Sequence, residues 1–392
     1  MNPSRPPAST LRLLAGLLAL GALLLACAPQ SQGMERPAPG AAAPAPSGAS
    51  APSQAAPAPT EAARAPAAPE TVKIGYLGTN MSNAGIFIAN EKGYFREEGF
   101  AADLLPFDAG TRMVPALATN EIQVGAGSAG AGLFNTVHRG IHNKVVADKG
   151  SGPPGAGWQA MIVRKDLYDS GALTRLEDLR GKSFGIFAYD ASQEVVLAHY
   201  LGLVGLTMND ISVVEVPVGD QPAAFANRTM DAAWAIEPSV AILVERGLAV
   251  RLLGSEERYP NQQTSTIMYS EQFANQRDAA TRWMVAYLKG IRDYNDAFVA
   301  GRNREEIVGI LEKVKVVTDR GLLDKFGLTG LNPNGYVHRG SLQEMHDFFV
   351  KKGTITQPVG LDELVDDSFV TAALGRIGIY DSPLYKDPGW LR

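Results

Sequence analysis

Cysteine is almost absent from this chain. Its 392 residues include a single cysteine, Cys27, so no disulfide can form within one molecule. Beyond Cys27 there is no thiol to serve as a nucleophile or a metal ligand. The five histidines form no HExxH motif, and His138 and His142 flank the turn-forming pair Arg139-Gly140. These absences argue against thiol catalysis and the common zinc motifs, and we expect no metal and no cofactor.

The chain also lacks a run or stripe of basic residues. Lys and Arg number 36 against 41 Asp and Glu, which gives a net charge of -5, and the basic residues are dispersed. Proteins that track nucleic acid concentrate Lys and Arg on one face and interleave aromatic residues with them. We therefore expect no nucleic-acid partner.

A long apolar run occurs at the N-terminus, where residues 13–25 consist of Leu, Ala and Gly and follow Arg5 and Arg12. The run is short for a membrane span and is typical of an export signal. The tetrapeptide LLAC that Cys27 completes resembles the lipobox of bacterial lipoproteins. That resemblance implies cleavage of a signal peptide at residues 1–26 and a lipid anchor on Cys27, at the extracytoplasmic face of the cell membrane. An ordinary secretory signal and an uncleaved membrane helix are the alternatives.

Residues 27–70 contain little besides Ala, Pro, Ser, Gly and Gln. Frequent prolines interrupt the helix that alanine would favour, and too few large apolar residues are present to form a core. We interpret this segment as a tether that lets a globular domain move near the membrane.

From residue 71 onward the pattern strand, turn, helix repeats. Strand-like runs occupy 72–76, 99–105, 122–126, 160–164, 183–187, 211–216, 230–236 and 266–269. Helical runs occupy 86–89, 111–117, 176–182, 189–203, 221–227, the stretch up to 298, 307–314 and 342–350. Repeated βαβ units predict an α/β fold, and the length suits two lobes. We place lobe 1 at 71–159 and 265–392 and lobe 2 at 160–264.

Three segments in order carry a family resemblance: KGYFREEGF at 92–100, LRGK at 179–182 and DAAWAIEP at 231–238. Together they resemble the ABC-importer solute-binding proteins of the nitrate, sulfonate, taurine and thiamine-precursor group. The resemblance implies a two-lobed periplasmic-binding-protein fold of type II, with two crossover strands and a ligand cleft between the lobes. It also implies an ABC permease and its ATPase as partners, a small-molecule ligand and a protein that is not an enzyme. A monomer is expected.

The candidate ligand contacts share one kind of position: each lies in a loop, or at the start of a helix, that faces the expected cleft. Such loops bring helix N-termini and closely approaching backbone to a ligand. The candidates are Asn80, Ser82, Asn83, Phe87, Thr111, Ser128, Trp158, Tyr189, Asp190, Ser192, Trp234 and Glu237. For the polar residues, helix capping or a tight turn is the alternative role. For Phe87 and Trp234, the alternative is packing in the core.

The aromatic candidates bear on the ligand. Trp158, Tyr189 and Trp234 could form an aromatic clamp, while Asp190 and Glu237 would repel a sulfonate but accept hydrogen bonds from a heterocycle. This favours a vitamin-like heterocycle, with riboflavin as the first expectation. A thiamine pyrimidine, a sulfonate, taurine or nitrate are alternatives. An extracytoplasmic sensor would have the same sequence features, and an enzyme like the pyrimidine synthases would need the cysteine-rich motif that this chain lacks.

Overall fold

The computed structural model describes residues 68–108, 112–128 and 130–390. The predicted signal peptide, Cys27 and nearly all of the predicted tether therefore lie outside the described residues, as does Thr111. None of the helices in the described part of the chain is long and apolar enough to cross a membrane.

The first β-sheet has five strands in the order β2-β1-β3-β10-β4. Strand β1 pairs in parallel with β2 and β3, whereas β10 runs antiparallel to β3 and β4. The strands are β1 (Glu70–Leu77), β2 (Phe100–Phe107), β3 (Val124–Gly127), β4 (Lys144–Gly152) and β10 (Gln262–Tyr269). We call the half of the described chain built on this sheet lobe 1.

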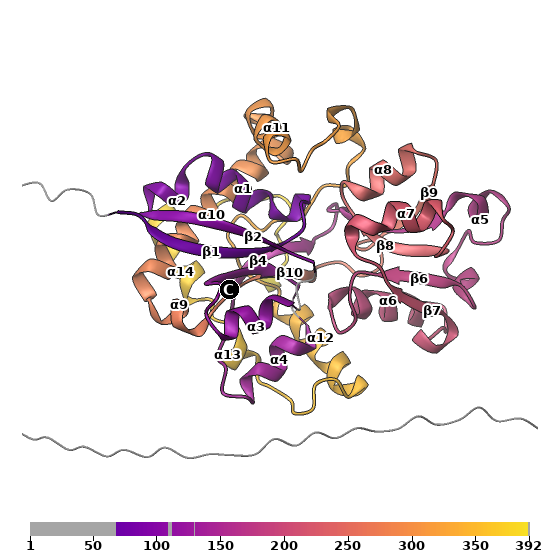
Figure 1. Ribbon diagram of the computed structural model, residues 1–392, viewed down its shortest axis with the longest axis horizontal. Helices are drawn as coiled ribbons and strands as arrows, with labels where there is room; N and C mark the ends of the chain where they lie inside the picture. Colours follow the sequence, from indigo (N-terminus) through magenta and orange to yellow (C-terminus); the bar gives the residue numbers. More distant parts are fainter. Residues whose placement is uncertain (1–67, 109–111, 129, 391–392) are drawn as a thin grey trace, which may run out of the picture. The chain divides into compact units, whose positions relative to one another are not determined.

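The second sheet repeats this arrangement in the order β7-β6-β8-β5-β9. Strand β6 is parallel to β7 and β8, and β5 is antiparallel to β8 and β9. The strands are β5 (Gln159–Arg164), β6 (Ser183–Ile186), β7 (Ser212–Glu215), β8 (Ala232–Ile236) and β9 (Ala249–Gly254). We call the half built on this sheet lobe 2; Figure 1 shows the two halves side by side.

The chain passes between the sheets through residues 153–158, after β4, and through residues 255–261, after β9. The fourth strand in each order, β10 in the first sheet and β5 in the second, begins directly after a crossing. Each runs antiparallel to its neighbours, β10 to β3 and β5 to β8. The predicted two-lobed α/β fold with two crossovers is confirmed. The residue limits chosen for the lobes, 160 and 264, remain a prediction.

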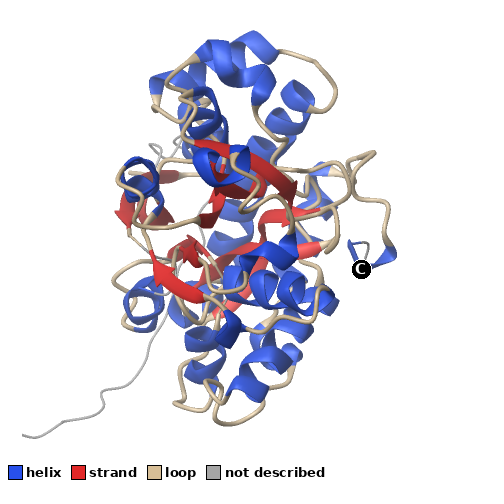
Figure 2. Ribbon diagram, turned by 90° about the vertical axis from the view of Figure 1, so that its right-hand side faces the viewer, coloured by secondary structure: helices blue, strands red, loops and turns tan. Residues whose placement is uncertain are grey.

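Helices flank the strands on both sides (Figure 2). Those of lobe 1 are α1 (Ala84–Glu91), α2 (Tyr94–Glu97), α3 (Met113–Ala118), α4 (Ala131–Val137), α9 (Glu271–Asn275), α10 (Arg277–Phe298), α11 (Arg304–Lys313), α12 (Arg339–Lys352), α13 (Leu361–Leu364) and α14 (Ser368–Ile377). Those of lobe 2 are α5 (Lys165–Asp169), α6 (Ser192–Leu203), α7 (Gln221–Ala226) and α8 (Ser239–Glu245). Short 3-10 turns include η1 (Met81–Asn83) and η6 (Arg320–Lys325).

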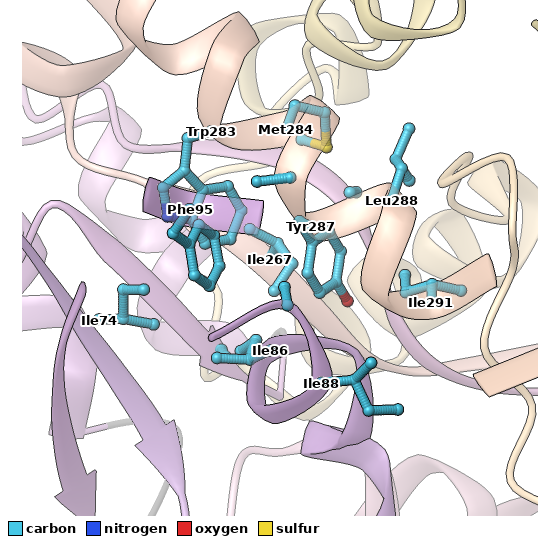
Figure 3. Packing of buried hydrophobic residues seen from close by; sticks show 14 of the residues in the cluster. Ile74, Ile86, Ile88, Phe95, Ile267, Trp283, Met284, Tyr287, Leu288 and Ile291 are labelled. Atoms are coloured by element: carbon cyan, nitrogen blue, oxygen red, sulfur yellow. The ribbon is translucent and has the colours of Figure 1, made fainter. Parts of the chain in front are cut away.

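The main core of lobe 1 lies between the sheet and the helix pair α1 and α10 (Figure 3). Trp283 and Tyr287 of α10 stack with ring centroids 5.4 Å apart. The two helices approach backbone to backbone, because a Cβ atom at Gly290 would lie 2.1 Å from the carbonyl oxygen of Gly85. This close packing holds α1, and with it the loop after β1, in a fixed position over the sheet.

Candidate functional site

A cavity lies between the two lobes, lined by residues that follow the strands or belong to the crossovers. The space open to the centre of a water molecule is about 40 Å³. Its lining residues are Leu77, Asn80, Ser82, Ser128, Lys149, Trp158, Gln159, Phe187, Ala188, Ala191, Ser192, Gln193, Ile236, Thr264 and Ser265. Both sheets contribute, so the cavity depends on how the lobes meet.

Lys149 is the only ionisable residue among the described residues that line this cavity. It lies on β4 and is fully buried. Its Nζ donates a hydrogen bond of 2.7 Å to the hydroxyl of Ser82, and no ion pair joins it to a carboxylate of the described residues. Burial lowers the pKa of the Lys149 ammonium to about 7, although the neighbouring Asp148 carboxylate favours its charged form.

Asp148 does not neutralise this ammonium by direct contact, because successive residues of a strand point to opposite faces. Its carboxylate accepts hydrogen bonds from the Asn332 backbone N–H at 2.7 Å and from the Gln263 amide at 2.7 Å. Burial raises the pKa of Asp148 to about 6 in spite of these donors. Lys149 is therefore left with N–H donors that face the cavity.

A short chain of hydrogen bonds orients Lys149. The Ser82 hydroxyl donates to Asn80 Oδ1 at 2.7 Å, so its oxygen is free to accept from Lys149. Asn80 Oδ1 also accepts from the Ser82 backbone N–H, and Asn80 Nδ2 donates to the Leu77 carbonyl. The turn after β1 thus fixes the position of the ammonium, as a supporting layer does around other charged sites.

Gln193 supplies a second donor from lobe 2. Its Oε1 accepts a hydrogen bond of 2.9 Å from the Phe187 backbone N–H, which fixes the orientation of the amide. Its Nε2 is buried and has no partner among the described residues. A buried donor without a partner is costly, so Lys149 and Gln193 together favour a ligand that offers hydrogen-bond acceptors.

The remaining walls are largely apolar. Trp158 packs over the Gly150 backbone and donates from Nε1 to the Ser151 carbonyl at 2.9 Å. Leu77, Ile236, Ala188 and Phe187 complete this part of the lining. Such a cavity suits a small ligand with a charged head and an apolar body.

Five of the predicted site residues are brought together at the cavity: Asn80, Ser82, Ser128, Trp158 and Ser192. Two of them act mainly between the lobes. The Ser128 hydroxyl lies 2.9 Å from Ser192 Oγ, and Ser192 Oγ donates to the Thr264 carbonyl at 2.8 Å. Ser128 Oγ also accepts from the Ser192 backbone N–H.

Two predicted residues of lobe 1 lie outside the cavity lining. Asn83 is fully buried, and its Nδ2 donates to the carbonyl oxygens of Leu77 and Gly78, where it holds the turn after β1. Phe87 points into the core and makes an edge-to-face contact with Tyr76 at 5.3 Å. Phe87 thus has the core role that was its alternative, whereas the Asn83 side chain holds a turn and makes no capping hydrogen bond to α1.

The structure does not form the expected aromatic clamp. Tyr189 is 44% exposed, because the turn after β6 directs its hydroxyl to the Val213 carbonyl. Trp234 is fully buried in lobe 2 against Phe184 and Tyr200. It lies within β8, two residues before Ile236, which ends that strand and does line the cavity.

The two predicted carboxylates also lie away from the cavity. Asp190 pairs with Lys352 at 2.8 Å on the outer side of the lobe contact. Glu237 is buried, and its carboxylate accepts hydrogen bonds from the backbone N–H groups of Ala241 and Gly327. Burial raises the pKa of Glu237 to about 7, against the effect of these donors. Neither carboxylate lines the cavity, so neither lies where it would repel a bound anion.

Lys149 was absent from the predicted site, although it contributes the cavity's charge. The signal that marks it is a lysine inside a strand whose last residues include two glycines, in the sequence KVVADKGSG at Lys144–Gly152. Such a lysine is rarely buried unless it is paired or functional.

Comparisons with known proteins agree with this fold. The alkanesulfonate-binding protein of Xanthomonas axonopodis pv. citri, solved bound to MOPS, is 19% identical with a TM-score of 0.62, covering 76% of this chain and 99% of that one. The periplasmic nitrate-binding protein of Synechocystis PCC 6803 is 14% identical with a TM-score of 0.66, covering 82% and 92%. A desulfurization enzyme has a TM-score of 0.54 at 15% identity, covering 79% and 99%. The shared fold therefore does not by itself separate binding from catalysis.

The two sheets and the cavity between them show the two-lobed fold of periplasmic solute-binding proteins. The sequence profile described as NMT1/THI5 like matches residues 80–296, more than half of the chain, so the chain belongs to the NMT1/THI5-like family. A candidate binding protein of Brucella abortus is 25% identical over 300 residues, covering 74% of this chain and 88% of that protein. A Brucella suis counterpart matches equally.

Proposed function

We propose that this protein is the extracytoplasmic solute-binding subunit of an ABC importer and that it captures a small organic or inorganic anion between its lobes. The proposal is carried by the buried ammonium of Lys149, which donates to Ser82 and has no carboxylate in ion-pair contact among the described residues. A buried charge without a partner is unfavourable, and an anionic ligand would offset that cost. The ligand would be bound and delivered without chemical change.

The same observations favour an anion over riboflavin, the first expectation from the sequence. A flavin would use several aromatic faces, whereas only Trp158 of the three clamp residues lines the cavity. A small sulfonate, nitrate or carboxylate offers acceptors to the Lys149 ammonium and to the Gln193 amide, which are the donors at the cavity.

The partners follow from the class of protein. We propose an ABC permease with its ATPase as the membrane partner, and anchoring of the chain through a lipid on Cys27. The names of the sulfonate- and nitrate-binding neighbours support a role in binding a small anion. Recovery of the protein with an ABC permease from membranes would separate this role from that of a sensor.

Titration of the protein with propanesulfonate, taurine, nitrate and riboflavin tests the proposal. Trp158 lies at the cavity, so tryptophan fluorescence should report binding, with calorimetry as the second measurement. We expect a saturable response to at least one of the anions and none to riboflavin. Sulfonate buffers are left out, since the Xanthomonas relative was solved with MOPS bound.

Lys149→Met should weaken binding of the responding anion by at least about 30-fold, as loss of a buried charged contact does. Its melting temperature should not fall, because the substitution removes a buried charge. Lys144→Met on the same strand is the matched control, since the Lys144 ammonium donates to the Glu363 carbonyl away from the cavity. Unchanged anion binding by Lys149→Met, or a response to riboflavin alone, would contradict the proposal.

A further inference from the structure

Several contacts join the two lobes, among them Gly327 with Glu237, and we call one set beside the cavity the seam. From lobe 1 it includes Ser128, Gly130, Ala131 and Lys352, and from lobe 2 it includes Asp190, Ala191, Ser192 and Glu194. Ser128, Ala191 and Ser192 also line the cavity, whereas Gly130 and Lys352 do not. All of these contacts join protein groups, so none of them needs a solute.

At Gly130 the lobes meet backbone to backbone. Gly130 forms an antiparallel bridge with Ala191, and the Ala131 N–H donates to the Asp190 carbonyl at 3.0 Å. A Cβ atom at Gly130 would lie only 2.2 Å from that carbonyl oxygen. The φ angle of Gly130 is −162°, which any residue adopts, so glycine is required here by the approach of the other lobe.

Lys352 supplies the charged part of the seam from the end of α12. Its Nζ lies 2.8 Å from Asp190 Oδ1 and 2.6 Å from Glu194 Oε1, both in lobe 2. The Glu194 side chain is only 4% exposed, and its Oε2 accepts from the Asp190 backbone N–H at 2.8 Å. Without Lys352, closing the lobes would bury the Glu194 carboxylate uncompensated, whereas separated lobes would leave it open to water.

We propose that Gly130 and Lys352 are positioning residues that hold the two lobes closed without a solute and so control access to the cavity. Lys352 favours the closed arrangement by compensating Glu194, and Gly130 permits it by lacking a side chain. Both act through the position of lobe 2 and touch no residue of the anion-binding pair Lys149 and Gln193. The inference requires only that the lobes can separate, and it holds whichever solute the cavity takes.

Distances between spin labels on the two lobes test this inference in the full chain with no solute added. Cys27→Ser removes the natural thiol, and labels are attached at Leu203→Cys in lobe 2 and Ile379→Cys in lobe 1, which are 52% and 71% exposed. We expect a main population at the short distance of the closed form. Lys352→Met should lower the ratio of closed to open molecules about tenfold, the size expected for a partly buried pair.

Gly130→Ala should remove the short-distance population altogether, because the clash is with backbone. Matched controls are Lys351→Met, a neighbouring exposed lysine, and Gly132→Ala, whose added Cβ would meet no atom within 4 Å. Both should keep the closed population. The pair Lys352→Met with Glu194→Gln should restore much of it, since glutamine needs no compensating charge and still accepts from Asp190.

Three results would overturn the inference: an open population alone in the labelled parent, closed distances in Gly130→Ala, or equal effects of Lys352→Met and Lys351→Met. Melting temperatures of all variants should stay within a few degrees of the parent, because each lobe keeps its own core. Failure of every test solute to bind would contradict the proposed function and leave this distance measurement intact.

Discussion

At the scale of single residues, the buried Lys149 ammonium is unfavourable in the ligand-free protein and is also the charge that would bind an anion. A fully buried ammonium that donates to one hydroxyl has lost most of its hydration, which is why burial lowers its pKa to about 7. An anion placed against it would restore a favourable partner and raise the pKa again. The residue that destabilises the empty cavity is then the one that selects its ligand.

Anion binding should therefore depend on pH. Above pH 7 the free protein increasingly holds Lys149 as the neutral amine, so binding of the responding anion should weaken by about tenfold per pH unit up to the raised pKa of the complex. Calorimetric titrations from pH 6 to pH 9 measure this. Lys149→Arg stays charged throughout and should give a flat profile.

Stability should change in the opposite direction over the same range. The unfolded chain holds the Lys149 proton up to pH 10.5, whereas the folded chain releases it near pH 7. Unfolding then takes up a proton, so this residue's contribution to the free energy of unfolding rises between these pH values.

The binding prediction has its own contradicting result. An anion affinity that rises with pH would show that Lys149 does not bind the ligand as an ammonium.

At the scale of secondary-structure elements, the helix pair α1 and α10 positions one wall of the site. The loop between β1 and α1 carries Asn80 and Ser82, so any shift of α1 would move the groups that orient Lys149. The pair can pack this closely because Gly85 and Gly290 face each other. The close approach of Gly85 and Gly290 therefore supports the ligand site, although neither glycine lines the cavity.

Gly290→Ala should destabilise the protein by about 1–3 kcal/mol, as overpacking of a core does. The added Cβ would lie 2.1 Å from the Gly85 carbonyl oxygen and 2.9 Å from Ala89 Cβ. Urea unfolding measures the change. Gly309→Ala in α11 has no atom within 4 Å of the added Cβ and should raise stability by about 0.5–1 kcal/mol. Equal stability of the two variants would show that the helices can move apart at little cost.

At the scale of the whole molecule, two sheets of the same strand order meet around one cavity. The two crossings, at 153–158 and 255–261, let the lobes move as units while the chain stays continuous. In this arrangement a small change at the seam alters access to the whole cavity. Ion pairs far from Lys149 can thus influence binding through closure.

The N-terminal part of the chain adds a second whole-molecule prediction. If Cys27 carries the anchor, the protein should sediment with membranes and partition into the detergent phase. Cys27→Ala should move it to the soluble extracytoplasmic fraction or leave an uncleaved precursor, because the acyl chains supply nearly all of the membrane affinity. Gln32→Ala is the control and should remain with membranes. A soluble parent protein would exclude the anchor.

Much of the fold follows from local sequence. The strand runs at 72–76, 160–164 and 211–216 were predictable because alternation and β-branched residues mark a strand wherever it lies. Strands β4 and β9 were not identified. The sequence of β4, KVVADKGSG, mixes charged residues and glycines, and only its burial between β10 and the C-terminal segments makes it a strand.

The site was predictable only in part, for a physical reason. The sequence alone determined which loops follow strands, and Asn80, Ser82, Ser128 and Ser192 do line the cavity. The direction of each side chain was decided by tertiary structure. The turn after β6 carries Tyr189 outward, and two residues along β8 separate Trp234, which is buried in lobe 2, from Ile236, which ends the strand at the cavity. The sequence of β4 marks Lys149 as an unusual strand lysine, but Lys149 becomes a site residue only because residues of lobe 2 meet it across the cavity, a contact between distant segments.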